Sequence, residues 1–97
     1  MSNDLIKTKD QWKENALINQ DKYIELYKES IENSENFWAK QAECIDWFTP
    51  FSKNSIKKID FSKENLEIKW FYDGKLNVSY NCIDRHLEKK GEDTAII

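Results

Sequence analysis

Glycine, proline and arginine are scarce in this sequence of 97 residues. It contains 2 glycines and 1 proline, and the glycines are far apart. A loop that holds a phosphate group through its backbone needs closely spaced glycines, so no such loop is expected. Arg85 is the only arginine, and the 15 basic residues are interleaved with 18 acidic ones for a formal net charge of −3. Nucleic-acid-binding surfaces concentrate positive charge, so no nucleic-acid partner is expected.

Cysteine and long apolar runs are also lacking. The 2 cysteines, Cys44 and Cys82, have none of the spacings typical of zinc sites, and nothing in the sequence supports a disulfide between them. No run approaches the roughly 20 apolar residues that a membrane-spanning helix needs. Residues 1–10 lack the apolar stretch of a secretory signal. We therefore expect no membrane partner and a reducing, cytoplasmic setting.

Aromatic residues are abundant for so polar a chain. The sequence has 4 tryptophans, 4 tyrosines and 5 phenylalanines, while only 39% of its residues are hydrophobic. A chain of this length has room for one small domain at most, and large rings dominate the burial in cores and interfaces. Either the core is rich in aromatic residues or another surface covers part of them.

The first half of the chain is expected to be helical after a polar arm at residues 1–20. In that arm only Trp12, Ala16, Leu17 and Ile18 favour a short helix. A helix is then predicted from Asp21, whose carboxylate suits the N-cap position. Ile24, Tyr27 and Ile31 follow on one face at spacings of three and four. On the outer face, Lys28 is spaced to pair with Glu25 and Glu32.

A second helix is predicted over residues 34–46. Asn33 or Ser34 is its expected N-cap, and Trp38, Ala42 and Ile45 form its apolar stripe. The segment DWFTPF (46–51) ends it, because Pro50 disfavours a helical conformation at the residue before it. Three aromatic residues around one proline indicate a pinned, extended crossover. Residues 52–65 receive no assignment.

The second half predicts a strand, a turn and a helix. Leu66, Ile68, Trp70 and Tyr72 alternate as in a strand with one buried face, and Asp73–Gly74 forms a turn. A last helix begins at the N-cap Asn77, its stripe is Tyr80, Ile83 and Leu87, and Gly91 is the expected C′ residue. Residues 94–97 resemble the start of a strand, so the chain is expected to continue beyond them.

Few side chains suit catalysis or metal binding. Cys82 and His86 are four apart and would share a helical face, but a zinc site needs three or four ligands and a cysteine nucleophile needs an oriented base. We expect a packed cysteine beside an exposed or hydrogen-bonded histidine. Asp84 and Arg85 are expected to anchor the last helix to neighbouring backbone or carboxylates; phosphate binding by Arg85 is the alternative. No catalytic, cofactor-binding or metal-binding residue is expected.

Two phrases of the sequence are specific enough to identify a family. One is YIELYKESIENSENFWAKQAECIDWFTPF (23–51), and the other is IKWFYDGKLNVSYNCIDRHLEKKGEDTAII (68–97). They resemble the phrases YxxLYxxSIxxPxxFW…LDWFxPF and KWFxxGKLNVSYNCLDRHL, which open the AMP-forming acetyl-CoA synthetases. The chain departs from the family at Ser34, where proline is frequent, and either residue suits the first turn of a helix.

The resemblance implies a function for the whole enzyme and a supporting role for this segment. The family joins acetate to ATP with magnesium, giving acetyl-adenylate and diphosphate, and then transfers the acetyl group to coenzyme A with release of AMP. Its ATP-binding motifs and its catalytic lysine lie beyond the position of Ile97, so ATP, Mg2+ and coenzyme A are expected to bind outside this segment. The family-signature residues, expected to dock and pack, are Trp70, Phe71, Asn77, Tyr80, Asn81, Asp84 and Arg85.

The fold implied is mostly α with a short β element, forming an N-terminal cap segment of the α/β adenylate-forming fold. Residues 1–20 would be the polar arm and 21–97 the N-terminal domain, ahead of the large AMP-binding domain that is its partner. Two alternatives stay open. One is a stand-alone helical interaction module, and the other is the same segment of a propionyl-CoA synthetase.

Overall fold

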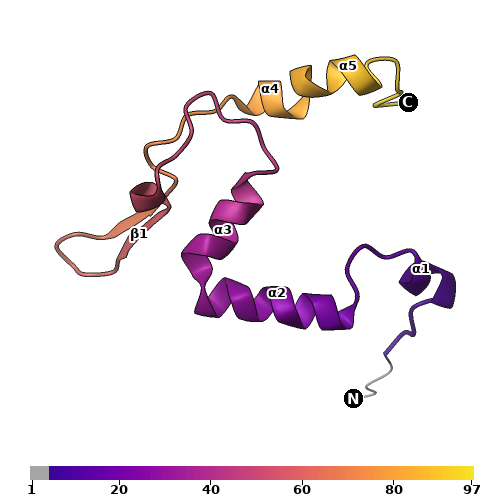
Figure 1. The fold of residues 1–97 in the computed structure, drawn as a ribbon, viewed down its shortest axis with the longest axis horizontal. Helices are drawn as coiled ribbons and strands as arrows, with labels where there is room; N and C mark the ends of the chain where they lie inside the picture. The colour runs from indigo at the N-terminus through magenta and orange to yellow at the C-terminus, as the bar shows by residue number, and fades with distance from the viewer. Residues whose placement is uncertain (1–4) are drawn as a thin grey trace. The chain divides into compact units, whose positions relative to one another are not determined.

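The computed structural model describes residues 5–97, which divide into two compact units that meet between Ser34 and Glu35. Helices account for most of the regular structure, and the remainder is one two-stranded antiparallel sheet. The elements, labelled in Figure 1 where there is room, are α1 (Asp10–Glu14), α2 (Gln20–Glu32), α3 (Ser34–Ala42), the 3-10 turn η1 (Lys53–Ser55), β1 (Lys57–Asp60), β2 (Glu67–Trp70), α4 (Val78–Cys82), η2 (Asp84–His86) and α5 (Leu87–Lys90).

Helix α2 begins earlier than the sequence predicted. Its N-cap is Asn19, whose side-chain oxygen accepts a hydrogen bond from the backbone N–H of Lys22 at 2.8 Å. Asp21 lies within the first turn, so its assignment as the N-cap was wrong. It still favours the helix there, because a negative charge near the N-terminus opposes the helix dipole. Helix α1 is likewise shorter than the segment that Trp12 to Ile18 suggested, since it ends at Glu14.

The apolar stripe of α2 is present but lies in the open. Ile24, Tyr27 and Ile31 are 54%, 58% and 67% exposed. Tyr23 stacks on Tyr27, with ring centroids 6.1 Å apart. Glu25 forms an ion pair with Lys22 at 3.4 Å, and not with Lys28 as the spacing predicted. Periodicity therefore predicted the face of the helix correctly, while no described residue of this unit covers that face.

Helix α3 ends at Ala42, four residues before the predicted end. The reason lies in the hydrogen bonds of the next residues. The N–H groups of Glu43, Cys44 and Ile45 donate to the carbonyls three residues back rather than four. The N–H of Asp46 then donates to the side chain of Asn81, so the α-helical ladder does not resume. The indole N–H of Trp47 donates to the carbonyl of Ala42. Asn33 is the C-cap of α2, and Ser34 is already the first residue of α3. The predicted break at these two residues is confirmed.

The DWFTPF segment is extended and pinned, as its proline and aromatic residues predicted. Thr49 and Lys75 form an antiparallel bridge, in which each N–H donates to the other's carbonyl at 3.0 and 2.9 Å. The N–H of Phe48 also donates to Lys75. Figure 1 shows the segment passing beside the chain that leaves β2. Trp47 and Phe51 pack edge to face, 5.0 Å apart, at the start of an aromatic cluster.

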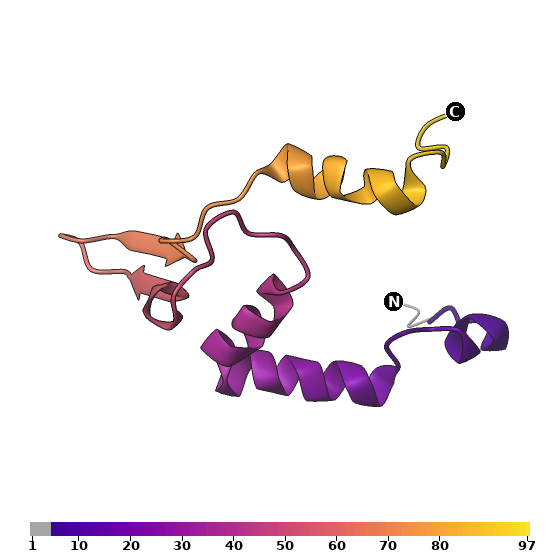
Figure 2. The same cartoon turned by 45° about the horizontal axis from the view of Figure 1, so that its top comes forward.

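The segment that the sequence left unassigned contains η1 and β1. β1 pairs with β2 in a hairpin, visible as two opposed arrows in Figure 2, with Lys57 opposite Trp70 and Asp60 opposite Glu67. The predicted strand is thus present but spans only Glu67–Trp70. The prediction that one face of this strand is buried was wrong, because Ile68 is 60% exposed. The hairpin has only two strands, and nothing in this unit covers Ile68.

The last helix is interrupted. Asn77 is the N-cap, as predicted, and its side-chain oxygen accepts from the N–H of Tyr80 at 2.9 Å. Ile83 leaves the helical conformation, with φ −123° and ψ −68°, so η2 and α5 follow as separate turns. Gly91 has φ −59° and ends α5 without the left-handed conformation expected of a C′ glycine. Residues 94–97 form no strand. Within residues 5–97, no helix combines the length and apolar character that crossing a membrane requires.

Gly74, in the turn after β2, allows the ring of Trp47 to approach its backbone closely. A Cβ at this position would lie 2.6 Å from Cζ3 of Trp47. Gly74→Ala should therefore displace the Trp47 ring and destabilise the chain by about 1–3 kcal/mol, the usual range for overpacking. Urea unfolding followed by near-ultraviolet circular dichroism measures this. Lys75→Ala, which changes only an exposed side chain of the same turn, is the control, and equal unfolding midpoints for the two variants would contradict the prediction.

Candidate functional site

The family-signature residues lie in two places in the second unit. Trp70 and Phe71 end the hairpin, while Asn77, Tyr80, Asn81, Asp84 and Arg85 belong to the α4–η2 segment or its cap. The two places are linked by the DWFTPF segment. Its residues touch Phe71 on one side and the side chains of α4 on the other.

The aromatic part of the site depends on the backbone of Phe71. This residue has φ 47°, the left-handed conformation that bulky side chains rarely adopt. Its N–H donates to the carbonyl of Ile56, which holds it in place at the end of the hairpin. Its ring lies 4.7 Å from Phe51 and 5.6 Å from Trp47. Phe71 therefore completes an aromatic cluster with the crossover.

Trp70, the residue before it, lies 6.2 Å from the Phe71 ring and links the cluster to a ring of α3. Its indole meets Trp38 of α3 edge to face, with centroids 6.1 Å apart, and it is 39% exposed. The ammonium group of Lys57 lies 5.5 Å from the centre of the Trp70 ring, a cation–π distance. Trp38, Trp70 and Phe71 together line an apolar surface hollow of about 310 Å³.

The polar part of the site is centred on Asn81, whose side chain is buried. Its Oδ1 accepts from the N–H of Asp46 at 2.7 Å, and its Nδ2 donates to the carbonyls of Asp46 and Asn77 at 2.9 and 3.0 Å. An amide side chain offers one acceptor and two donor hydrogens. All of these groups form hydrogen bonds. Asn81 thereby bonds both the N–H and the carbonyl of Asp46, as a neighbouring strand would.

Arg85 strengthens the same junction. Its Nε donates to the carbonyl of Asn81 at 2.7 Å, its Nη1 donates to the carbonyl of Cys44 at 2.9 Å, and Nη1 lies 3.7 Å from the carboxylate of Asp46. The rigid fork of donors on arginine allows one side chain to reach both carbonyls. The expectation that Arg85 anchors this segment to neighbouring backbone and a carboxylate is confirmed.

The remaining signature residues have unequal roles in this junction. Asn77 caps α4, and the ring of Tyr80 packs against Phe48 at 5.1 Å. Asp84 differs, because its side chain is exposed and its carbonyl accepts the N–H of Leu87. Sequence analysis missed the receiving partner, the backbone of Cys44 to Asp46. Only the resemblance of the DWFTPF phrase hinted at its importance.

Cys82 and His86 do not share one helical face, because the helix is interrupted between them at Ile83. Both cysteines are free and exposed, so the expectation of a packed Cys82 was wrong. Nε2 of the His86 ring accepts a hydrogen bond from Nε of Arg85 at 3.4 Å. In the part of the chain that the structure describes, no three His, Cys, Asp or Glu side chains are grouped closely enough to hold a metal ion.

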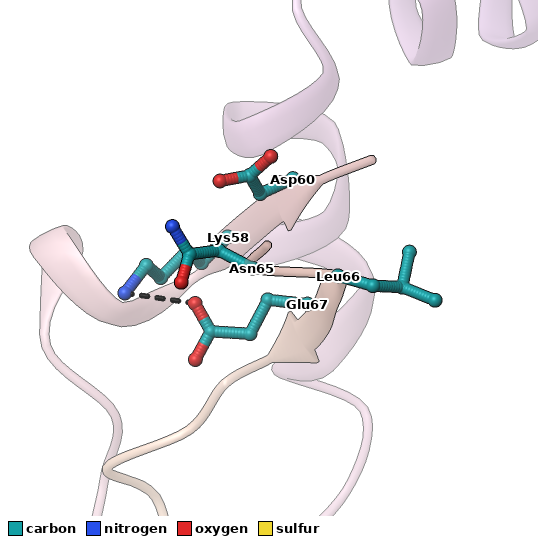
Figure 3. A pocket seen from close by; sticks show the side chains of 5 residues that line it. All are labelled: Lys58, Asp60, Asn65, Leu66 and Glu67. Atoms are coloured by element: carbon teal, nitrogen blue, oxygen red, sulfur yellow. Dashed lines mark ion pairs between the residues drawn. The ribbon is translucent and has the colours of Figure 1, made fainter. Parts of the chain in front are cut away.

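A second hollow, of about 450 Å³, lies on the hairpin and is polar (Figure 3). Glu67 accepts ion pairs from Lys69 at 2.6 Å and from Lys58, across the hairpin, at 2.9 Å. Hydrogen bonds from Lys69 and then Lys58 hold the pKa of Glu67 below its ordinary value, and the bond to Glu67 raises the pKa of Lys58. Figure 3 shows Leu66 pointing away from this pair. This cluster could not be predicted from the sequence, because residues 52–65, which contain β1, received no assignment.

The contacts of these residues are aromatic packing and hydrogen bonds to neighbouring backbone. Residues 23–82 match the family described as the acetyl-coenzyme A synthetase N-terminus. The chain belongs to this family.

Full-length relatives place the match at one end of a longer protein. The chain is 53% identical to the acetyl-coenzyme A synthetase of Methylorubrum populi and 48% identical to that of Desulfatibacillum aliphaticivorans, each over all 97 residues. It is 56% identical to that of Mesorhizobium japonicum over 86 residues. The chain spans about 15% of the length of the first two relatives and 13% of the third.

Arg85→Lys should weaken the junction although it keeps the positive charge. A lysine ammonium lacks the planar fork, so it cannot satisfy the carbonyls of Asn81 and Cys44 together. The loss should be about 1–3 kcal/mol, as for a hydrogen bond to a charged group. Urea unfolding measures it, with Lys89→Arg in α5 as a matched exchange of the same two residue types. If Arg85→Lys unfolds at the same urea concentration as the unaltered chain, the fork is unimportant.

The hairpin should lose stability in acid through Glu67. Its pKa is lowered from 4.5 in the folded chain, so the ionised carboxylate favours the folded hairpin. That contribution is present above the ordinary pKa and disappears as the pH falls through the lowered value. Glu67→Gln should abolish this part of the acid response, measured from the Hα chemical shifts of β1 and β2 between about pH 7 and pH 3. Glu64→Gln in the hairpin loop should retain it; an unchanged response in Glu67→Gln would refute the assignment.

Proposed function

We propose that this chain is the N-terminal segment of an AMP-forming acetyl-CoA synthetase and that it packs on the catalytic part of that enzyme. The relatives named above support this, because they bear that name and align with the whole chain or nearly all of it. Residues 1–20 would be a polar arm and 21–97 the packing domain of a cytoplasmic enzyme with the adenylate-forming fold.

The chemistry of the whole enzyme follows from its name and lies outside this segment in our proposal. Acetate attacks the α-phosphate of ATP, giving acetyl-adenylate and diphosphate with Mg2+ as the charge-neutralising ion. The thiol of coenzyme A then takes the acetyl group and AMP leaves. ATP, Mg2+ and coenzyme A would all be bound by the catalytic part. The groups of residues 5–97 contribute order and contact rather than reaction steps.

The observation that supports a packing role is the shortage of internal burial. Ala42 and Ile56 are the buried hydrophobic residues of the described chain, whereas Tyr27, Trp38 and Trp70 are 58%, 41% and 39% exposed. Exposed apolar surface of this extent marks an interaction site. A self-sufficient module of this size would bury roughly 60% or more of its surface around its own core. In the proposed enzyme, the signature residues Trp70 and Phe71 would dock, while Asn77, Tyr80, Asn81 and Arg85 would hold the docking segment in shape.

The activity is tested by comparing the full-length enzyme with the 97-residue chain. The full-length enzyme should form AMP from ATP only with acetate, coenzyme A and Mg2+ all present, and chelation of Mg2+ should stop it. The isolated chain should form none, since it has no phosphate-binding loop. AMP formation by the isolated chain would disprove the packing role. A preference for propionate over acetate would instead assign the enzyme to the related propionyl-CoA synthetases.

A further inference from the structure

The β1–β2 hairpin has two faces of opposite chemistry. Side chains alternate between the faces of a strand, and residues opposite each other across the ladder share a face. The pairs Lys58–Lys69 and Asp60–Glu67 are therefore on one face, which is entirely charged. The pairs Ile59–Ile68 and Lys57–Trp70 are on the other, which is apolar except at Lys57.

The charged face is complete as it stands. Glu67 is paired with both Lys58 and Lys69, and the two lysine side chains are 57% and 50% exposed, so water solvates their remaining hydrogens. Exposed ion pairs of this kind are stable in water and need no covering surface. Nothing on this face calls for a partner.

The apolar face is incomplete. Ile68 is 60% exposed and Ile59 38% exposed, and Trp38 extends the surface by packing against Trp70. We call Ile59, Ile68, Trp70 and Trp38 the hairpin apolar face. The hollow of about 310 Å³ between Trp38, Trp70 and Phe71 opens beside it. An aliphatic or aromatic side chain inserted there would meet three rings, the type of contact that dominates interface energies.

We propose that the hairpin apolar face is the surface that the catalytic part of the same polypeptide covers, while the charged face stays in solvent. This rests on the proposed function. The occupant follows from two facts. A two-stranded hairpin is marginally stable unless its apolar face packs on something, and Ile68 stays 60% exposed in the second unit although Trp38 packs against Trp70. The matched relatives are also far longer than this chain, which spans 15% of the first, so a covering surface is available in every enzyme molecule.

Thiol accessibility in the full-length enzyme tests this with adjacent positions of β2. Ile68→Cys places a thiol on the apolar face and Lys69→Cys places one on the charged face. Uncovered, the two positions are similarly exposed, at 60% for Ile68 and 50% for the Lys69 side chain. Maleimide labelling is timed for each variant, and peptide mass spectrometry locates the modified thiol. Labelling in urea gives the rate at which each thiol reacts in the unfolded enzyme, which is the reference for protection.

We expect the Ile68→Cys thiol to react at least about tenfold more slowly than the Lys69→Cys thiol, with the same ratio at low and high enzyme concentration. The pair Ile59→Cys and Lys58→Cys on β1 should repeat it. Equal rates, or protection of both faces, would overturn the proposal. Protection lost on dilution would also overturn it, because a second enzyme molecule would then be the occupant. Acetate-dependent AMP formation by the unsubstituted enzyme is measured separately, so the proposed function and this interface can fail independently.

Discussion

Asn81 turns its side-chain amide toward the backbone of Asp46, and the arrangement of the second unit depends on this contact. The amide accepts from the N–H of Asp46 and donates to its carbonyl, so that N–H cannot continue α3. The helix stops at Ala42, and the chain passes into the extended segment that pairs with Lys75. That pairing brings Trp47 and Phe51 to Phe71. One buried amide therefore holds the chain where it leaves the turn after α3 and enters the segment that carries the aromatic cluster.

The unit is ordered more by such polar contacts than by a hydrophobic core. An intramolecular hydrogen bond contributes about 0.5–1.5 kcal/mol net, and more when one group is charged. Asn81 and Arg85 together make several of them at a single junction. This construction has a consequence for function. Because hydrogen bonds within the segment hold its shape, its aliphatic and aromatic side chains are left available for contact with another surface.

Sequence reasoning succeeded where the determining interaction is local. The cap at Asn77 and the turn at Asp73–Gly74 each depend on residues within a few positions. Where a distant residue decides, the outcome was mixed. Pro50 predicted the extended segment, although Lys75 holds it. The path of the chain after α3 depends on Asn81, 35 residues beyond Asp46, and β1 was recognisable only through its pairing with β2. In the candidate site, the anchoring role of Arg85 was predictable, because it is the only arginine. The backbone carbonyls that accept its hydrogen bonds were not predictable.

The hairpin shows a third kind of outcome, in which the pattern was correct and the conclusion drawn from it was not. The alternation of Ile68 and Trp70 correctly predicted an apolar face, yet both residues are exposed within this unit. A period of two records which side of a strand faces apolar surroundings, and it does not record which part of a protein provides them. In a complete domain, the apolar surroundings of a strand face lie within the domain itself. Here they do not, because Ile68 and Trp70 stay exposed within the second unit. The unmet prediction of burial therefore marks the face on which we propose that the catalytic part packs.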